Sequence, residues 1–219
     1  MISILIPVMN YDCSALVDDL YVQAERLRIG TGVDYEIIVG DDASTDVVTV
    51  NSNKEACSRP RCRFVSNAVN YGRAKNRNAM AELSKGDLLL IIDCDAKVCR
   101  QNFLASYIEA AKGNDVVCGG IAAPNSLPSP DVALRYKYER NARKVRSLEY
   151  RVANPYRHFS TFNVLIRRDV FMEIMFDEKC VEYGYEDALF GLRLEQRGIH
   201  VEHIDNPLVH VGMDTNESF

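Results

Sequence analysis

The sequence predicts an α/β fold with a mostly parallel central sheet covered by helices on both faces. Strand-like and helix-like segments alternate along the chain, and the strand-like segments are nearly continuous apolar runs. Such runs are typical of parallel strands, which are buried on both faces. With 219 residues, 47% of them hydrophobic, the chain can bury one full core, so we expect a single domain over residues 1–219.

The first half of the chain contains four expected strands and three expected helices. The strands are residues 2–8 (ISILIPV), 35–40 (YEIIVG), 62–66 (CRFVS) and 87–93 (DLLLIID). Each is a short run rich in β-branched and other apolar residues, which is the composition typical of strands. The helices are expected between the first two strands, where Leu16, Leu20, Ala24 and Leu27 recur at helical spacing, at 73–84, and near 101–112.

The second half begins with an apolar run at 115–123 and then changes character. Residues 131–157 hold eight Lys and Arg residues against three acids, a local charge of +5 in a chain of net charge −5. Their apolar residues keep helical spacing, so we expect one basic amphipathic helix. Those apolar residues are Leu134, Tyr138, Ala142, Val145, Leu148 and Val152. A strand at 161–167, a helix at 186–197 and a last strand at 200–211 complete the expected elements.

Charge and composition argue against several classes of protein. A net charge of −5 argues against nucleic-acid binding through overall charge. No run approaches the roughly 18–20 apolar residues that span a bilayer. The seven cysteines form no CxxC pair and no zinc-like spacing with histidine, so we expect reduced thiols and a cytoplasmic location.

Paired acids follow two of the expected strands directly. Asp41 and Asp42 come after the second strand, and Asp93 and Asp95 come after the fourth. Ligands of open parallel sheets bind outside the carboxyl ends of the strands. Packing explains charges there poorly, because carboxylates are rarely buried without a partner. This edge of the sheet is therefore the expected site.

The stretch DCDA (residues 93–96) permits three interpretations. Carboxylates two residues apart beyond a strand can converge on one Mg²⁺ or Mn²⁺, which prefers oxygen ligands. They can also be two solvated loop acids. The third interpretation is a haloacid-dehalogenase-type phosphatase with D-x-D-x-[TV], but Lys97 stands at the fifth position of that motif.

The stretch DDASTD (residues 41–46) combines two signals. Ser44 or Thr45 could cap a following helix, which explains the hydroxyl groups but not the two acids before them. A carboxylate at a strand tip can accept a hydrogen bond from a nucleobase N–H. Asp41 and Asp42 are therefore candidate nucleotide contacts.

The stretch NYGRAKNRN (residues 70–78) opens an expected helix with cations. Gly72 permits close approach of the backbone, and Arg73, Lys75 and Arg77 lie in the first turns. Cations at a helix N-terminus oppose the helix dipole unless an anion also binds there. A bound phosphate would resolve the conflict, and a solvated basic face is the alternative.

Three titratable residues near the end of the chain also permit two interpretations each. Glu186 and Asp187 open the helix at 186–197, where acids are ordinary partners of the helix dipole. A general base also needs a carboxylate held at a cleft by a rigid helix. His210 ends the last strand and is either structural or a metal ligand.

Taken in order, these stretches resemble the family 2 glycosyltransferases, which have the GT-A fold and use nucleotide sugars. The matching stretches are SILIPVMN, YEIIVGDDASTD, NYGRAKNRNAMAELSKGDLLLIIDCDA, NVLIRRDVF, YGYEDALFGLRLEQRGI and IDNPLVHVG, and they cover nearly the whole chain. The resemblance implies a Rossmann-like three-layer α/β/α domain. Residues 1–122 would form its nucleotide-sugar half and residues 123–219 its acceptor half.

The resemblance also implies roles for single residues. The implied nucleotide-sugar contacts are Pro7, Met9, Asp41, Asp42, Asn70, Gly72, Arg77 and Asp93. Among them, Asp42 would pair with a uracil ring, and Met9 stands where the family commonly has an aromatic residue. Asp95, with Asp93 and His210, would bind Mn²⁺ or Mg²⁺. Asp187 would be the general base of an inverting displacement, and Glu186 would orient the acceptor.

The implied activity is transfer of a sugar from a UDP-sugar to a glycan or lipid-linked acceptor in bacterial-type surface polysaccharide synthesis. The basic segment 131–157 suits an anionic membrane face, and a solvated charged surface is the alternative. We therefore expect a cytoplasmic protein, peripheral at the inner face of the membrane, with no nucleic-acid partner. Two other functions stay open, nucleotide binding without turnover and a D-x-D phosphatase-like hydrolase.

Overall fold

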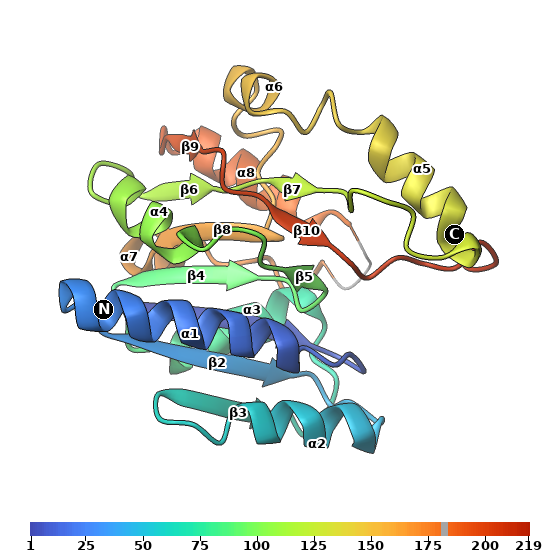
Figure 1. Cartoon of the computed structure of the whole chain (residues 1–219). Helices are drawn as coiled ribbons and strands as arrows, with labels where there is room; N and C mark the ends of the chain where they lie inside the picture. The colour runs from blue at the N-terminus through green and yellow to red at the C-terminus, as the bar shows by residue number, and fades with distance from the viewer. Residues whose placement is uncertain (181–183) are drawn as a thin grey trace.

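In the computed structural model, which describes residues 1–180 and 184–219, the chain forms a central sheet. Its seven strands lie in the order β3-β2-β1-β4-β8-β6-β9 (Figure 1). Their bounds are Ile2–Val8 (β1), Tyr35–Asp41 (β2), Cys62–Ser66 (β3), Leu88–Ile92 (β4), Val116–Cys118 (β6), Asn163–Arg167 (β8) and Val201–His203 (β9). Only β8 runs antiparallel to its neighbours, so the predicted mostly parallel sheet is confirmed.

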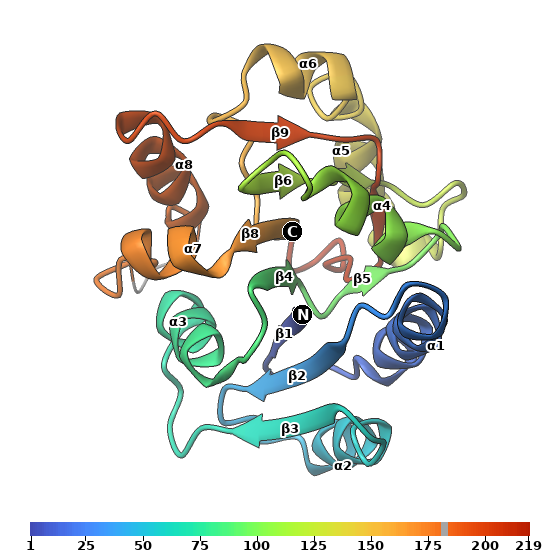
Figure 2. The ribbon, with the colours of Figure 1, turned by 90° about the vertical axis from the view of Figure 1, so that its left-hand side faces the viewer.

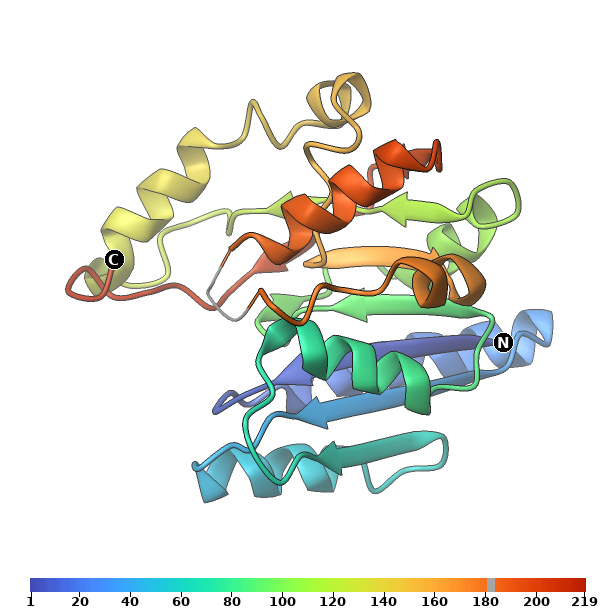
Figure 3. The same ribbon diagram turned by 180° about the vertical axis from the view of Figure 1, so that it is seen from behind.

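Helices cover both faces of this sheet (Figures 2 and 3). The first face packs on α1 (Ser14–Thr31), α2 (Val47–Ala56) and α4 (Phe103–Ala110), and the second on α3 (Arg73–Leu83), α7 (Arg168–Ile174) and α8 (Glu186–Gln196). Successive strand residues face opposite sides, so Ile4 joins the first core and Leu5 the second. Burial on both sides explains why these strands are continuous apolar runs. The predicted three-layer α/β/α arrangement is confirmed.

Two predicted strands are each divided between two sheets. The run 115–123 becomes β6 and β7 (Ile121–Ala122), and the run 200–211 becomes β9 and β10 (Leu208–His210). The strands β5 (Ala96–Lys97), β10 and β7 form a separate three-stranded sheet. Gly120 has a φ of +96°, a conformation that bends the chain between β6 and β7. Pro207, which has no N–H to donate to a ladder, precedes β10.

The basic segment 131–157 does not form the single helix that was predicted. It comprises a 3₁₀ turn (Pro130–Val132), α5 (Ala133–Asn141) and α6 (Leu148–Ala153), with irregular chain between the two helices. Its polarity is also opposite to the expectation. Leu134 and Val152 are more than half exposed, whereas Glu139 and Arg151 are buried. The charged side chains turn inward because they have buried partners there, which the periodicity of the sequence cannot reveal.

The helix after β2 has a different cap from the one considered for it. Asp46 is the N-cap of α2, and its carboxylate accepts a hydrogen bond from the N–H of Val48. Ser44 instead accepts a hydrogen bond from the N–H of Asn10, at the end of β1. Neither Ser44 nor Thr45 is therefore the cap, and both belong to the loop from β2 to α2, which is hydrogen-bonded to Asn10 after β1.

All seven cysteines are free, four of them are buried, and Cys99 is exposed. Among the described residues, no helix has the length and the apolar composition to cross a membrane.

Candidate active site

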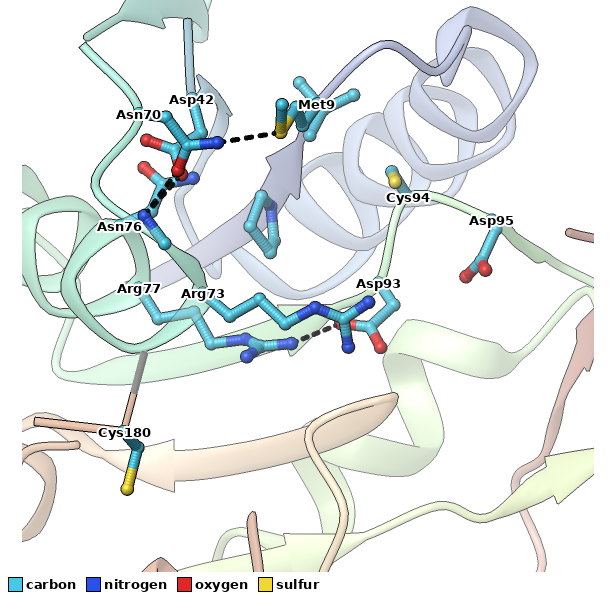
Figure 4. Close-up of a pocket in the computed structure, with 13 residues that line it drawn as sticks. Met9, Asp42, Asn70, Arg73, Asn76, Arg77, Asp93, Cys94, Asp95 and Cys180 are labelled. Atoms are coloured by element: carbon cyan, nitrogen blue, oxygen red, sulfur yellow. Dashed lines mark hydrogen bonds and ion pairs between the residues drawn. The ribbon is translucent and has the colours of Figure 1, made fainter. Parts of the chain in front are cut away.

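The strand ends and the start of α3 surround a cleft of about 430 Å³ (Figure 4). The cleft lies at the carboxyl edge because β1, β2 and β4 are parallel and end together. Seven of the predicted nucleotide-sugar residues line it, together with Asp95: Pro7, Met9, Asp42, Asn70, Gly72, Arg77 and Asp93. Asp41 does not line the cleft, because its carboxylate accepts a hydrogen bond from Ser66 Oγ at 2.7 Å on the other side of the strand end.

Asp42 holds the loop that forms one wall of the cleft. Its carboxylate accepts hydrogen bonds from the N–H groups of Tyr71 and Gly72, both at 2.8 Å, and from the side-chain amide of Asn67 at 2.9 Å. Gly72 has a φ of +78°, which a residue with a side chain rarely adopts. The predicted base-binding acid therefore also fixes the shape of the pocket in which it lies.

Met9 and Asn70 form the outer lip of the same cleft. The side-chain amide of Asn70 lies 3.1 Å from the sulfur of Met9, as Figure 4 shows. Met9 is 48% exposed, so its thioether is free to cover a planar ligand. Asn76, whose amide donates to the carbonyl oxygen of Gly40, lines the inner wall and was not predicted.

Arg77 lies between Asp93, directly after β4, and Glu186, at the start of α8. Its side chain is only 3% exposed, and its guanidinium lies 2.8 Å from Asp93 and 3.5 Å from Glu186. Burial disfavours the charged form of Arg77, but nearby carboxylates, Asp93 first, raise its pKa overall. Its Nε is buried and has no hydrogen-bond partner within residues 1–180 and 184–219. Arg77 is therefore not on a solvated basic face but is a buried cation between two carboxylates.

A second cleft, of about 340 Å³, adjoins the first and shares Arg73, Arg77, Asp93 and Asp95 with it. Asp187 lies in this second cleft, where its carboxylate accepts hydrogen bonds from the N–H of Thr161 at 2.9 Å and from Thr161 Oγ1 at 2.8 Å. Burial raises the pKa of Asp187 above its ordinary value, against the opposing effects of Arg77 and of the hydrogen bonds from Thr161. A carboxylate held this way has the properties of a general base.

Glu186, which precedes Asp187, has a different environment. It is 5% exposed, faces Arg77, and accepts a hydrogen bond from the N–H of Gly184 at 3.1 Å. Residues 181–183, which include the first residue of the matching stretch YGYEDALFGLRLEQRGI, lie outside the described residues. In the structure Glu186 therefore forms an ion pair with Arg77. Its predicted contact with an acceptor stays a prediction.

His210 joins Asp95 to a buried carboxylate of α5. Its Nε2 lies 3.1 Å from Asp95 Oδ2, and its Nδ1 lies 3.3 Å from Glu139 Oε1. Burial lowers the pKa of His210, but the two carboxylates outweigh burial and raise it to about 9. Burial also disfavours the charged form of Glu139 and by itself would raise its pKa. The hydrogen bonds that Glu139 accepts from His210 and Arg146 outweigh burial and lower this pKa to about 2. These side chains form a chain of charged groups along the wall of the second cleft.

The atoms that Asp95 and His210 present suit a hard divalent cation. Their 3.1 Å separation is close to the about 3.0 Å between adjacent ligands of an octahedron with bonds of about 2.1 Å. Glu139 holds the other ring nitrogen, as outer carboxylates commonly do for histidine ligands. The backbone also approaches closely, since a Cβ on Gly212 would lie 2.5 Å from the Cβ of Asp95.

Asp93, the third predicted metal ligand, is bonded to Arg77 instead. Across residues 1–180 and 184–219, no group of three or more His, Cys, Asp and Glu side chains is arranged as a metal site. The described side chains therefore offer two adjacent ligands, and a cation here would need further oxygen atoms from a ligand such as a diphosphate.

Sequence reasoning missed the side chains that support these acids. Thr161 positions Asp187, and Glu139 positions His210. Glu139 was one of three acids in a basic segment, and its spacing of four from Arg135 was its only signal. That spacing is also typical of a solvated surface pair, so the sequence could not distinguish the two.

A doubly wound α/β sheet, with a nucleotide-sized cleft at its carboxyl edge and acids directly after β4 and at the start of α8, defines a protein of the GT-A class. The family model described as "Glycosyl transferase family 2" matches residues 3–175. The chain therefore belongs to glycosyltransferase family 2, and the predicted family is confirmed.

Curated relatives match at low identity and are longer proteins. The chain is similar to a chondroitin synthase of Pasteurella multocida, with 25% identity over 95% of this chain and 24% of that protein. It is also similar to an undecaprenyl-phosphate 4-deoxy-4-formamido-L-arabinose transferase of Pseudomonas paraeruginosa, with 30% identity over 53% of this chain and 34% of the relative. The matches thus cover about a third or less of the length of these two relatives.

Solved structures share the fold. A mannosyltransferase of Pyrobaculum calidifontis in complex with GDP-Man and Mn²⁺ matches with a TM-score of 0.65 and 15% identity, over 96% of this chain and 56% of that one. Residues 1–349 of TarS from S. aureus, in complex with UDP-GlcNAc, match with a TM-score of 0.66 and 17% identity, over 94% of this chain and 57% of that one. At such identities these likenesses establish the fold alone.

Proposed function

We propose that this chain is an inverting glycosyltransferase that transfers a sugar from a UDP-sugar to a glycan or lipid-linked acceptor, with Mn²⁺ or Mg²⁺, in bacterial-type surface polysaccharide synthesis. The observation that carries the proposal is the position of Asp187. This carboxylate lies in a cleft that shares Arg77, Asp93 and Asp95 with the nucleotide-sized cleft. A base and a donor site therefore adjoin, as transfer between two bound molecules requires.

The first cleft suits the donor. Its volume of about 430 Å³ is that of a small-molecule site, and polar groups line its inner wall. In the proposed complex the base lies between Pro7 and Met9 and hydrogen-bonds to Asp42. Arg73 extends from α3 toward Asp93, as Figure 4 shows, and in the proposed complex its guanidinium contacts the diphosphate. The S. aureus structure with UDP-GlcNAc supports a uridine nucleotide by analogy of fold.

In the proposed reaction Asp187 accepts the proton of an acceptor hydroxyl group. The hydroxyl oxygen attacks the anomeric carbon, the bond to the diphosphate breaks, and the configuration inverts. Thr161 keeps the carboxylate oriented, and the raised pKa of Asp187 makes it a better proton acceptor than an ordinary aspartate. A divalent cation held by Asp95 and His210, with Asp93 nearby, would neutralise the charge of the departing diphosphate.

A thermal-shift series followed by a turnover assay tests the proposal. We expect UDP at about 100 times its dissociation constant to stabilise the chain by about 2.7 kcal/mol, or about 5–10 °C, in the presence of Mn²⁺. GDP and CMP should give smaller shifts, and UDP-sugars should be slowly hydrolysed. Stabilisation by UDP without any turnover would favour a nucleotide-binding protein. Phosphatase activity without a nucleotide response would favour the D-x-D hydrolase and would sink the proposal.

The metal arm of this experiment has a variant that keeps every proposed ligand. In Gly212→Ala the new Cβ would lie 2.5 Å from the Cβ of Asp95 and 2.6 Å from its Oδ2, so the carboxylate must move. We expect this variant to lose the part of the UDP shift that depends on Mn²⁺ and to keep the rest. An unchanged Mn²⁺ dependence would remove Asp95 from the proposed cation site.

We further propose that the protein acts in the cytoplasm, peripherally at the inner face of the membrane, with residues 131–157 as the contact. In this segment Leu134, Val145 and Val152 are exposed beside the exposed basic residues Arg143 and Lys144. Exposed apolar residues next to cations suit the surface of an anionic bilayer. The undecaprenyl-phosphate transferase among the relatives supports a lipid-linked acceptor.

Sedimentation with liposomes tests the membrane contact. The double variant Arg143→Glu with Lys144→Glu should bind vesicles containing anionic lipid at least about tenfold more weakly than the unmodified protein, at about 1 kcal/mol per cation near the surface. Arg146 is left unchanged because it pairs with buried Glu139. Equal, weak binding by both proteins would end the membrane proposal.

A further inference from the structure

A third cleft, of about 240 Å³, adjoins the second and shares none of the described lining residues of the first. The two clefts share Ile121, Arg146 and Ser160, and Ser160 directly precedes Thr161, which holds Asp187. The third cleft is lined by residues of β7, of the link from α5 to α6, and of the loop before β8. A molecule that extends from Asp187 away from the donor would therefore enter it.

The lining of the third cleft has an unbalanced charge. Arg146, Arg151 and Arg157 line it, and none of its lining residues is an acid. Arg146 has a carboxylate partner in Glu139, which lines the second cleft rather than the third. In a chain of net charge −5, this concentration of cations is local. Cations in a cleft with walls of low dielectric constant produce a focused positive potential.

Arg151 is the most buried of these three arginines. It is 6% exposed, and its guanidinium donates to the carbonyl oxygens of Cys118, Gly119 and Ile204 at 2.9 to 3.4 Å. Its guanidinium also contacts a side chain, the ring nitrogen Nδ1 of His203, at 2.9 Å. Burial lowers the pKa of His203 to about 4, so this partner is also neutral at pH 7. Among the described residues Arg151 donates hydrogen bonds to neutral groups alone, although the charge of Asp205 favours its charged form. A buried cation without a hydrogen-bonded carboxylate is costly, and a nearby anion would offset the cost.

His158 provides a second, independent sign of a missing partner. Its Nε2 is buried and has no hydrogen-bond partner among the described residues. Its ring packs edge-on against Tyr150, with the centroids 5.1 Å apart. Burial, with the charges of Arg157 and Arg151, lowers the pKa of His158, so the ring is neutral at pH 7. Buried polar atoms in proteins are nearly always paired, and an anionic oxygen would accept a hydrogen bond from this nitrogen.

The remaining walls suit the body of a sugar. Tyr138, Val145 and Phe159 line the cleft with apolar surface, and Asn163 adds a polar group. A saccharide ring packs its apolar face on such side chains and directs its hydroxyl groups to polar ones.

We propose that the third cleft binds the acceptor and selects acceptors that carry an anionic group, a carboxylate or a phosphate, which Arg157 and His158 contact. The role of the bound sugar as the acceptor rests on the proposed function, whereas the binding of an anionic sugar in this cleft does not. Arg157 is exposed at the mouth of the cleft and is therefore able to meet a ligand without rearrangement of the core. Arg151 contributes through its field, because carbonyl oxygens and His203 already take its donors.

Calorimetric titration in the presence of UDP and Mn²⁺ tests the proposal with matched small probes. The probes are methyl glucuronide, its neutral methyl ester, glucose 6-phosphate and methyl glucoside. We expect each anionic sugar to bind about tenfold more tightly than its neutral counterpart. A preference for only one of the two anionic probes tells a carboxylate-bearing acceptor from a phosphate-bearing one. Equal binding of charged and neutral probes would overturn the proposal.

The variants Arg157→Ala and Arg143→Ala separate a specific contact from general attraction. Both arginines are exposed and lie within the basic segment 131–157, but of the two only Arg157 lines the cleft. The preference should fall to about twofold in Arg157→Ala and stay near tenfold in Arg143→Ala, whereas equal losses in both variants would overturn the proposal. A preference without donor hydrolysis would contradict the proposed function and leave the anion cleft standing. Donor hydrolysis without the preference would contradict the anion cleft alone.

Discussion

Replacing Asp187 by asparagine should lower the rate of sugar transfer by about 10² to 10⁴-fold, the usual contribution of a general base. Asparagine keeps the size of the side chain and both contacts with Thr161, since its carbonyl oxygen accepts from the N–H and its amide donates to Oγ1. The donor site is lined by other residues, so the dissociation constant for UDP should change by less than about threefold. Initial rates and a UDP titration of the same preparation measure both quantities.

The stability of the Asp187→Asn variant shows whether a lost activity is a lost fold. The folded chain raises the pKa of Asp187, so the folded state binds the proton more tightly than the unfolded state. Stability therefore falls as the pH rises from the unfolded pKa through the folded one, and the ionised carboxylate destabilises the fold at pH 7. The variant should consequently melt at the same temperature as the unmodified protein or higher. A lower melting temperature would contradict this account of the site.

The pH dependence of the reaction follows from the same shift. Transfer requires the ionised form of Asp187, so kcat/KM should be constant above the raised pKa and fall with unit slope below it. The midpoint of this fall should lie above the ordinary aspartate value of 3.8. Glu195→Gln, in the last turn of the same helix and exposed, is the matched control and should leave rate and profile unchanged. An acidic limb that persists in Asp187→Asn would assign the base to another residue.

The sequence predicts the main sheet and the acids at its edge because both depend on local patterns. A strand buried on both faces must be a continuous apolar run, and a site at the carboxyl edge must follow such a run directly, as Asp93 follows Ile92. The three-stranded sheet leaves no such record, because β5 and β7 have two residues each. Strands this short have no periodicity to read.

The partners of the acids could not be predicted, because they come from distant parts of the chain. Arg77 and Glu186 are 109 residues apart, and His210 and Asp95 are 115 apart. Similarly, the helical spacing of apolar residues at 131–157 indicated helical structure but predicted the wrong side of it to be buried. Glu139 is buried and draws Arg135 and Arg146 inward, so the apolar residues are left outside. A hydrophobic pattern identifies a face only when burial is apolar, and here the buried groups are charged.

Replacing Arg77 by methionine should cost about 3 kcal/mol of folding free energy. Methionine fills much of the same volume, so the loss is chiefly electrostatic. It leaves Glu186, which is 5% exposed, without the cation 3.5 Å away, and Asp93 without its partner at 2.8 Å. Breaking a buried ion pair by removing one partner typically costs about 3–5 kcal/mol, and partial exposure of Asp93 places the estimate at the lower end. Urea denaturation should measure this loss of free energy, and thermal denaturation should show a melting temperature lower by about 6–12 °C.

Two further variants test whether this cost comes from the carboxylate of Glu186, which Arg77→Met leaves buried without its cation. Arg73→Met removes a cation one turn earlier on α3, 3.9 Å from the same carboxylate but mostly exposed, so it should cost less than about 1 kcal/mol. The double variant Arg77→Met with Glu186→Gln should recover at least about 1 kcal/mol relative to Arg77→Met, because a neutral amide is less costly to bury than an unpaired carboxylate. If the double variant were no more stable than Arg77→Met, packing rather than charge would explain the loss. The buried arginine between the donor cleft and the base would then be a structural spacer, and the acids beside it would hold their positions without it.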